Sequence, residues 1–197
     1  MSTLAMTASD AAETDSVIID GSMPFWAGLS FGTASFVNYL VLSGAVHLPH
    51  PGMIGLVWMG ATAAFLLFGV ILKLGVDPMT KVHPGFRRYR AVWGSLILGA
   101  MFLVGAFIAM LMQFGVGDKA PFISSPITLC IYGIGWRMAA VMSGRKWPNL
   151  LAVGAFLCAI YTATLAGTPQ QYLVHTLCIV VFAVLPGLTL LLRKPAV

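Results

Sequence analysis

Long apolar runs alternate with short segments of proline, glycine and charged residues along almost the whole chain. A helix that crosses about 30 Å of hydrocarbon needs roughly 20 residues at a rise of about 1.5 Å per residue. Six runs have about this length, and they predict helices at residues 25–46, 53–75, 91–114, 122–142, 150–167 and 172–192. The pattern therefore predicts an all-α fold, a bundle of six transmembrane helices joined by short loops.

Composition agrees with a membrane protein. Hydrophobic residues make up 59% of the 197 residues, charged residues make up 9%, and the mean hydropathy is +0.92. Soluble domains carry about 25% charged residues, so that class is excluded. We expect an acidic, disordered cytoplasmic leader at 1–24, the transmembrane domain at 25–192 and a short basic cytoplasmic tail at 193–197. The leader lacks the basic start of a secretory signal, and an alternative is that its acids dock on the basic connector at 87–90.

The basic residues predict how the chain lies in the membrane. Ten of the eleven lysines and arginines flank the second connector, the fourth connector and the tail, and Lys119 alone lies on the other side. Lysine and arginine are retained on the cytoplasmic side, so both termini are expected there, in a bacterial cytoplasmic membrane. The net charge of +5 is thus a topology signal, and no nucleic-acid partner is expected. Four tryptophans near predicted helix ends fit an interfacial belt: Trp26, Trp93, Trp136 and Trp147.

Familiar catalytic patterns are missing from the sequence. None of the six acids falls inside a predicted span, which argues against a transporter driven by a membrane-embedded carboxylate. Phosphate-binding loops, nucleophile elbows and the metalloprotease His-Glu pattern are also absent from the sequence. The sequence therefore leans against an enzyme.

Small residues at four-residue spacing indicate where helices approach closely. Lipid tails provide no hydrophobic drive for helix association, so close backbone contact must supply it. The fifth predicted helix carries the longest stripe, and we expect it to be central or to hold a tight neighbour. The predicted packing residues are Gly28, Gly32, Gly135, Ala139, Ala155, Ala159, Ala163 and Gly167.

A few polar residues inside the spans are candidates for a solute path or for contacts between helices. Asn38, Tyr39, Thr62 and Tyr132 belong to this group. Arg137 lies near the cytoplasmic end of its span, where it can extend its charge to the interface; binding of a buried partner or an anionic ligand is the alternative.

Two prolines fall inside predicted spans. Pro126 and Pro186 are expected to kink their helices and to release backbone carbonyls from helical hydrogen bonding.

Histidines and cysteines are the candidate metal ligands. His47, His50 and His175 map to the outer face with several methionines, a set that suits copper or haem. An extended segment would separate His47 from His50 by about 9 Å, so interfacial histidines are the other interpretation. We expect no cofactor, with haem or copper as the alternative. The cysteines are expected to serve packing: Cys130, Cys158 and Cys178.

Two functions remain compatible with these patterns, and a third is less favoured. The first is an accessory or assembly subunit that packs in the bilayer against other membrane proteins or against a second copy. The alternative is a small permease or channel for a neutral or weakly polar solute. The third is a membrane protein that binds metal or haem through the outer histidines and methionines.

Overall fold

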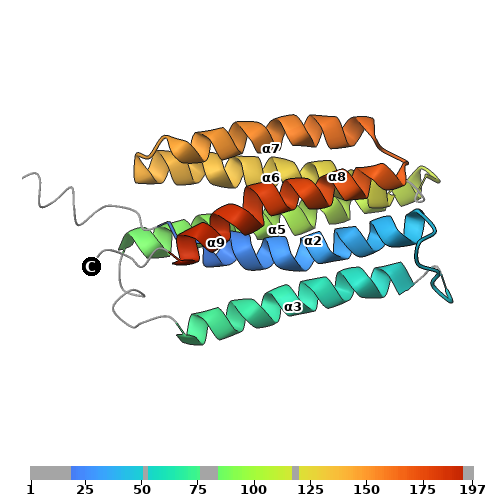
Figure 1. Cartoon of the computed structure of the whole chain (residues 1–197), viewed down its shortest axis with the longest axis horizontal. Helices are drawn as coiled ribbons and strands as arrows, with labels where there is room; N and C mark the ends of the chain where they lie inside the picture. Colours follow the sequence, from blue (N-terminus) through green and yellow to red (C-terminus); the bar gives the residue numbers. More distant parts are fainter. Residues whose placement is uncertain (1–18, 51–52, 76–83, 117–119, 193–197) are drawn as a thin grey trace, which may run out of the picture.

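The chain forms a bundle of long helices that lie along one common axis (Figure 1). The computed structural model describes residues 19–50, 53–75, 84–116 and 120–192, and the regular elements in these ranges are all helical. They are α2 (Ser22–Leu42), α3 (Met53–Gly75), α5 (Pro84–Gln113), α6 (Ala120–Ser143), α7 (Trp147–Thr164), α8 (Pro169–Ile179), the π-helix η2 (Val180–Val184) and α9 (Leu185–Leu192). The predicted all-α class is confirmed.

Five stretches in the described chain are long and apolar enough to cross a membrane. They are α2, α7, the Met53–Ile71 part of α3, the Arg87–Gln113 part of α5, and the continuous stretch Pro169–Leu192 formed by α8, η2 and α9. The architecture is therefore that of a multi-pass membrane protein. The helix α6 is long enough but is not among the five, because serines, a proline and Arg137 interrupt its apolar sequence.

Proline and glycine place the helix ends differently from the apolar runs. The helix α5 begins at Pro84, and the basic residues at 87–90 continue this helix instead of forming a connector. Proline fits the first turn of a helix because the N–H it lacks would have no partner there. Pro148 and Pro169 likewise stand in the first turns of α7 and α8. The helix α2 ends at Leu42, and Gly44 follows with a φ of 78°.

The centre of the bundle is an antiparallel pair, α2 against α8, η2 and α9. The pair approaches closely at glycines: a Cβ added to Gly28 would lie 2.8 Å from the Ala183 Cβ, and one added to Gly32 would lie 3.1 Å from a methyl carbon of Ile179. The helices α6 and α7 pack tightly together and flank α8. The helix α3 lies on α2 through aromatic contacts, among them Trp26 stacked on Phe68 with centroids 3.9 Å apart, and α5 lies on α6.

The helix α7 lies at the edge of the bundle, against α6 (Figure 1). It buries Ala155 and Ala159, but Ala163 and Gly167 from the same predicted stripe are exposed. Since an α-helix has about 3.6 residues per turn, each four-residue step rotates the stripe by about 40°. Ala163 has thereby rotated toward the surface, and Gly167 lies beyond α7, which ends at Thr164, with a φ of 89°. The expected tight neighbour is α6.

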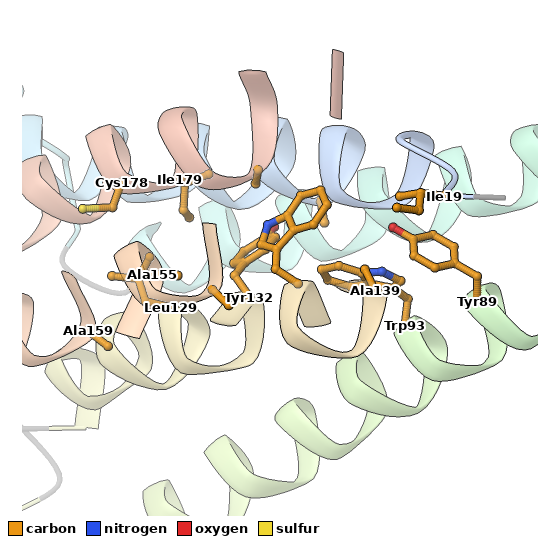
Figure 2. Packing of buried hydrophobic residues seen from close by; sticks show 14 of the residues in the cluster. Ile19, Tyr89, Trp93, Leu129, Tyr132, Ala139, Ala155, Ala159, Cys178 and Ile179 are labelled. Atoms are coloured by element: carbon orange, nitrogen blue, oxygen red, sulfur yellow. The ribbon is translucent and has the colours of Figure 1, made fainter. Parts of the chain in front are cut away.

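The described end of the leader lies at the start of α2. The Asp20 carboxylate accepts hydrogen bonds from the Ser22 backbone N–H at 2.9 Å and from its hydroxyl at 2.5 Å. Ile19 is buried, and the Tyr89 hydroxyl points toward it (Figure 2). The other leader acids, at 10, 13 and 15, and the tail at 193–197 lie outside the described residues, so their predicted disorder and docking stay predictions.

Candidate functional site

Buried polar side chains concentrate at one end of the bundle, where α2 and α7 end and α6 and α8 begin (Figure 1). Ser22 lies at the opposite end. Those at the first end are Ser35, Asn38, Ser125, Thr162, Gln171 and His175, each no more than 2% exposed. Buried polar groups in an apolar bundle require hydrogen-bond partners. This end is therefore the candidate functional site.

Its centre is a set of four side chains that we call the polar cluster: Ser35 and Asn38 from α2, and Tyr172 and His175 from α8. The Ser35 Oγ lies 2.8 Å from His175 Nδ1 and 3.2 Å from the Tyr172 carbonyl oxygen. Because α2 and α8 are antiparallel, the next turn of α2 meets the preceding turn of α8, which brings Asn38 alongside Tyr172. The helix pair thus presents two adjacent polar layers.

Several polar atoms at this end have no hydrogen-bond partner. They are Asn38 Oδ1, Ser125 Oγ, Gln171 Oε1, Tyr172 Oη and His175 Nε2. An unsatisfied buried polar atom costs about 1 to 3 kcal/mol. Five of the seven unpartnered buried side-chain atoms in the described residues lie at this end, and the other two belong to Tyr89 and Trp93.

Both internal prolines have a freed carbonyl that a side chain from another helix satisfies. Pro126 of α6 has no N–H to offer the Phe122 carbonyl one turn earlier, and that oxygen accepts the Gln171 side-chain N–H at 2.6 Å. Pro186 of α9 stands in the same relation to the Phe182 carbonyl, which accepts the Trp136 indole N–H at 2.6 Å. We call these contacts the two proline clamps. In the first clamp a side chain of α8 donates to a carbonyl of α6, and in the second a side chain of α6 donates to a carbonyl of η2.

The other half of the bundle is filled by aromatic rings. Trp93 of α5 meets Tyr89, Tyr132 and Trp136 with ring centroids 6.3, 6.0 and 6.0 Å apart, and Trp136 lies 5.7 Å from Trp147. Tyr89, Trp93 and Tyr132 reach into the same packed region in Figure 2. We call these five residues the aromatic cluster. Trp93 and Trp136 are at most 2% exposed, so they belong to the core and not to the expected interfacial belt.

The polar residues singled out from the sequence have different environments. Asn38 and Tyr132 are buried, in the polar and aromatic clusters respectively. Tyr39 is half-buried, with its ring 6.2 Å from that of Phe36.

The other two polar candidates are used locally. The hydroxyl of Thr62 donates to the Trp58 carbonyl of its own helix at 2.9 Å. Arg137 is exposed and donates from Nη1 to the Asn149 Oδ1 of α7 at 2.7 Å. Asn38 is the member of this set that lies in the polar cluster.

The three candidate histidines do not share one environment. His47 and His50 are exposed on the segment between α2 and α3, whereas His175 is buried in α8 and contacts Ser35. Among the described residues, no three side chains of His, Cys, Asp or Glu form a group that could hold a metal ion. The cysteines are free thiols, and Cys158 of α7 lies next to Cys178 of α8.

The predicted packing residues are used in different ways. A Cβ on Gly135 would meet the Trp93 ring at 2.5 Å, and Ala139 is 1% exposed beside the aromatic cluster. Ser35, Gln171 and Tyr172 were not identified from the sequence. A usable signal exists, because Ser35 shares a helix face with Asn38 and Tyr172 shares one with His175.

An apolar groove of about 500 Å³ adjoins the polar end of the bundle. Its walls come from α5, α6 and the end of α7 and include Phe107, Phe122, Pro126 and Ala163. Phe122 also borders the polar cluster, since its ring centroid lies 6.1 Å from that of Tyr172. Phe122 therefore both lines the groove and packs against one residue of the polar cluster.

Comparison of the chain with protein-family models, with curated proteins and with solved structures gave no match in any of the three. The class defined by the fold is a helical multi-pass membrane protein, and this fold class by itself implies no particular function.

Proposed function

We propose that this protein is an accessory or assembly subunit that uses the outer faces of α3 and α5 to bind another membrane protein. It lies in a bacterial cytoplasmic membrane, crosses it six times and keeps both termini in the cytoplasm. Its role is to hold or complete a complex, without chemistry of its own. The low burial of α3 and α5 carries this proposal.

These two helices are attached to the bundle along one side each. In the most apolar 18-residue stretch of α3, 11% of the residues are buried, and in the corresponding stretch of α5 none is. The comparable value for α2 is 33%. Exposed apolar residues such as Leu67 of α3, at 61%, and Phe102 of α5, at 73%, form the outer surface. These faces meet either lipid or another protein.

Glycines on these faces favour a protein. Small residues let two membrane helices approach closely, and this is how membrane helices associate. A Cβ added at any of six glycines would meet nothing within 4 Å: Gly55, Gly60 and Gly69 in α3, and Gly94, Gly99 and Gly105 in α5. Gly28 and Gly187, by contrast, are covered by a neighbouring helix. The six open glycines therefore leave room for a helix of a partner protein to pack closely against α3 and α5.

The distribution of polar side chains supports this role over that of a permease. A permease for a polar solute needs hydrogen-bonding groups through the whole thickness of the bilayer. In the described residues, the buried polar side chains gather at one end, and the aromatic cluster fills the bundle beyond them. A continuous polar route would have to pass Trp93 and Trp136.

The proposed topology is supported by where the basic residues fall. The helix α6 lies along the same axis as its neighbours α5 and α7 (Figure 1), as a sixth crossing requires. Arg87, Arg137 and Arg145 lie where α5 and α7 begin and α6 ends, so they share one end of the bundle. Basic residues at one end mark the cytoplasmic side.

Site-specific photo-crosslinking in the native membrane tests the proposal. A photoreactive residue replaces Leu67 of α3, Phe102 of α5 or, as a control of equal exposure, Leu157 of α7, which is 62% exposed. We expect the first two positions to join one defined foreign polypeptide that also co-purifies stoichiometrically, while position 157 captures lipid. Replacing Gly60 by leucine should release that polypeptide. Lipid adducts at all three positions, or crosslinks to a second copy of this chain, would overturn the accessory role.

A further inference from the structure

The polar cluster contains buried hydrogen-bonding atoms that have no partner, and its residues are not part of the proposed docking faces on α3 and α5. The Asn38 side chain lies within hydrogen-bonding reach of the Tyr172 hydroxyl, yet Asn38 Oδ1 and Tyr172 Oη make no hydrogen bond of good geometry. His175 uses Nδ1 toward Ser35, and its Nε2 is unpartnered. Asn38, Tyr172 and His175 are at most 2% exposed, so bulk water does not satisfy these atoms.

These atoms form a matched set of donors and acceptors. The Asn38 Oδ1 is an acceptor, and the Tyr172 hydroxyl can donate or accept. His175 Nε2 donates or accepts a hydrogen bond according to the tautomer of the ring. Polar groups that lie near one another without a direct bond are commonly bridged by an ordered water, and a ligand that reproduces the hydrogen bonds of that water can take its place. One turn before His175, Gln171 holds a further unpartnered acceptor, Oε1.

We propose that the polar cluster is a binding site for a small uncharged molecule that carries both a hydrogen-bond donor and an acceptor, such as a simple amide or alcohol. Its donor meets Asn38 Oδ1, and its acceptor receives the Tyr172 hydroxyl. His175, fixed by Ser35, offers Nε2 as the third contact.

The ligand is uncharged because the site offers no counter-charge. The helices α2, α8 and α9 and the π-helix η2 contain no Asp, Glu, Lys or Arg. An ion in this apolar interior would lose its hydration and gain no opposite charge, which is costly at membrane depth. A neutral molecule needs only the hydrogen bonds that the cluster provides.

The apolar groove supplies a route to the site. It is lined by Phe122 and Pro126, and the Phe122 ring is the side chain that packs against Tyr172. Pro126 interrupts the helical hydrogen bonding of α6 at this point, and the Gln171 side chain holds the Phe122 carbonyl in its place. A small molecule that enters from the bilayer therefore reaches the cluster by passing Phe122.

The test uses acetamide as the neutral probe and acetate as its charged counterpart of almost the same shape. The full chain, labelled with ¹⁵N-histidine and ¹³C-tyrosine, is studied in lipid bilayers by solid-state NMR. We expect acetamide to shift the His175 Nε2 and Tyr172 signals saturably and acetate to leave them unchanged. Tyr172→Phe, which removes only the unpartnered hydroxyl, should weaken acetamide binding by about tenfold. Tyr132→Phe, in the aromatic cluster, should leave binding unchanged.

Three results would overturn the proposal. The first is a water contact at His175 with no saturable response to acetamide, which means that the cluster holds water only. The second is an equal response to acetate. The third is acetamide binding that Tyr172→Phe leaves intact. Spectra of the Tyr172→Phe protein without a probe report whether it folds, and Asn38→Leu provides an independent loss of the acceptor.

Discussion

The proline clamp at Phe182 is the contact whose removal gives the sharpest test of how this bundle is held together. Trp136 of α6 is fully buried and donates its indole N–H to the Phe182 carbonyl at 2.6 Å. Pro186 cannot supply the helical donor for that oxygen, and the π-helix η2 at this place shifts the hydrogen bonding, so that the Leu185 N–H donates to the Val180 carbonyl. In Trp136→Phe the Phe182 carbonyl loses this donor.

The size of the effect can be worked out from the contacts. Leaving a buried acceptor unsatisfied costs about 1 to 3 kcal/mol, whereas hydrogen bonds between membrane helices average about 0.6 and reach about 1.7 kcal/mol. Phenylalanine keeps one ring against Trp93 and Trp147, so part of each aromatic contact, worth about 0.5 to 1.5 kcal/mol, persists. We expect Trp136→Phe to lower the free energy of unfolding by about 2 kcal/mol.

A second substitution separates the hydrogen bond from the lost ring volume. In Trp136→Phe with Pro186→Ala, the alanine N–H can bond the Phe182 carbonyl, so the double variant should recover about 1 kcal/mol relative to Trp136→Phe. The assay is reversible unfolding in mixed micelles of mild detergent and dodecyl sulfate, followed by far-ultraviolet circular dichroism. If Pro186→Ala changes stability equally with and without Trp136, the two sites are independent and the clamp contributes nothing.

The remaining predictions use the same unfolding assay. Gly28→Leu should cost about 1 to 3 kcal/mol or prevent folding, because Ala183 occupies the space of a new side chain, whereas Gly55→Leu, which meets open space, should stay within about 0.5 kcal/mol. Equal effects at both glycines would contradict the close packing of α2. Arg137→Ala should cost less than about 1 kcal/mol, since its bond to Asn149 is exposed, and Arg137→Lys should restore a charged anchor; a large loss in both would indicate a bidentate buried site.

The other proline clamp provides an independent repeat of the first test. Gln171→Leu removes the donor to the Phe122 carbonyl, and Pro126→Ala offers that oxygen a backbone N–H again. The same pattern of loss and recovery is expected at this end of the bundle. Recovery at one clamp but not at the other would show that the proline is not the shared cause.

The helices could be predicted well from the sequence because the requirement that a membrane imposes on a spanning helix is simple. A membrane core demands long apolar runs with internally satisfied backbones, and such runs are visible without any knowledge of neighbours. Helix ends were less accurate because proline begins α5 earlier and glycine ends α2 earlier than hydropathy suggests. The basic residues at 87–90 are an example. A search for apolar runs places them in a connector, although they are helical.

The polar interior could not be read in full from the sequence. Release of carbonyls by Pro126 and Pro186 follows from proline chemistry, but the donors Gln171 and Trp136 lie 49 and 46 residues away from the oxygens they satisfy. Trp136 also looks interfacial when only its position in the span is known. Its burial depends on Gly135, which leaves room for the Trp93 ring, and such a match between two helices has no signature within either one.

The C-terminal segment α8–η2–α9 joins the two parts of the interior. Its His175 meets Ser35 of α2, its Gln171 bonds the Phe122 carbonyl of α6, and its own Phe182 carbonyl receives Trp136 of α6. These three polar contacts between helices therefore all involve one segment, while aromatic contacts such as Trp26–Phe68 and Trp93–Tyr132 hold α3 and α5 to their neighbours. A partner that replaced lipid on α3 and α5 would leave each of these hydrogen bonds intact. This separation is why docking on the outer faces and ligand binding in the polar cluster can be tested independently in the same chain.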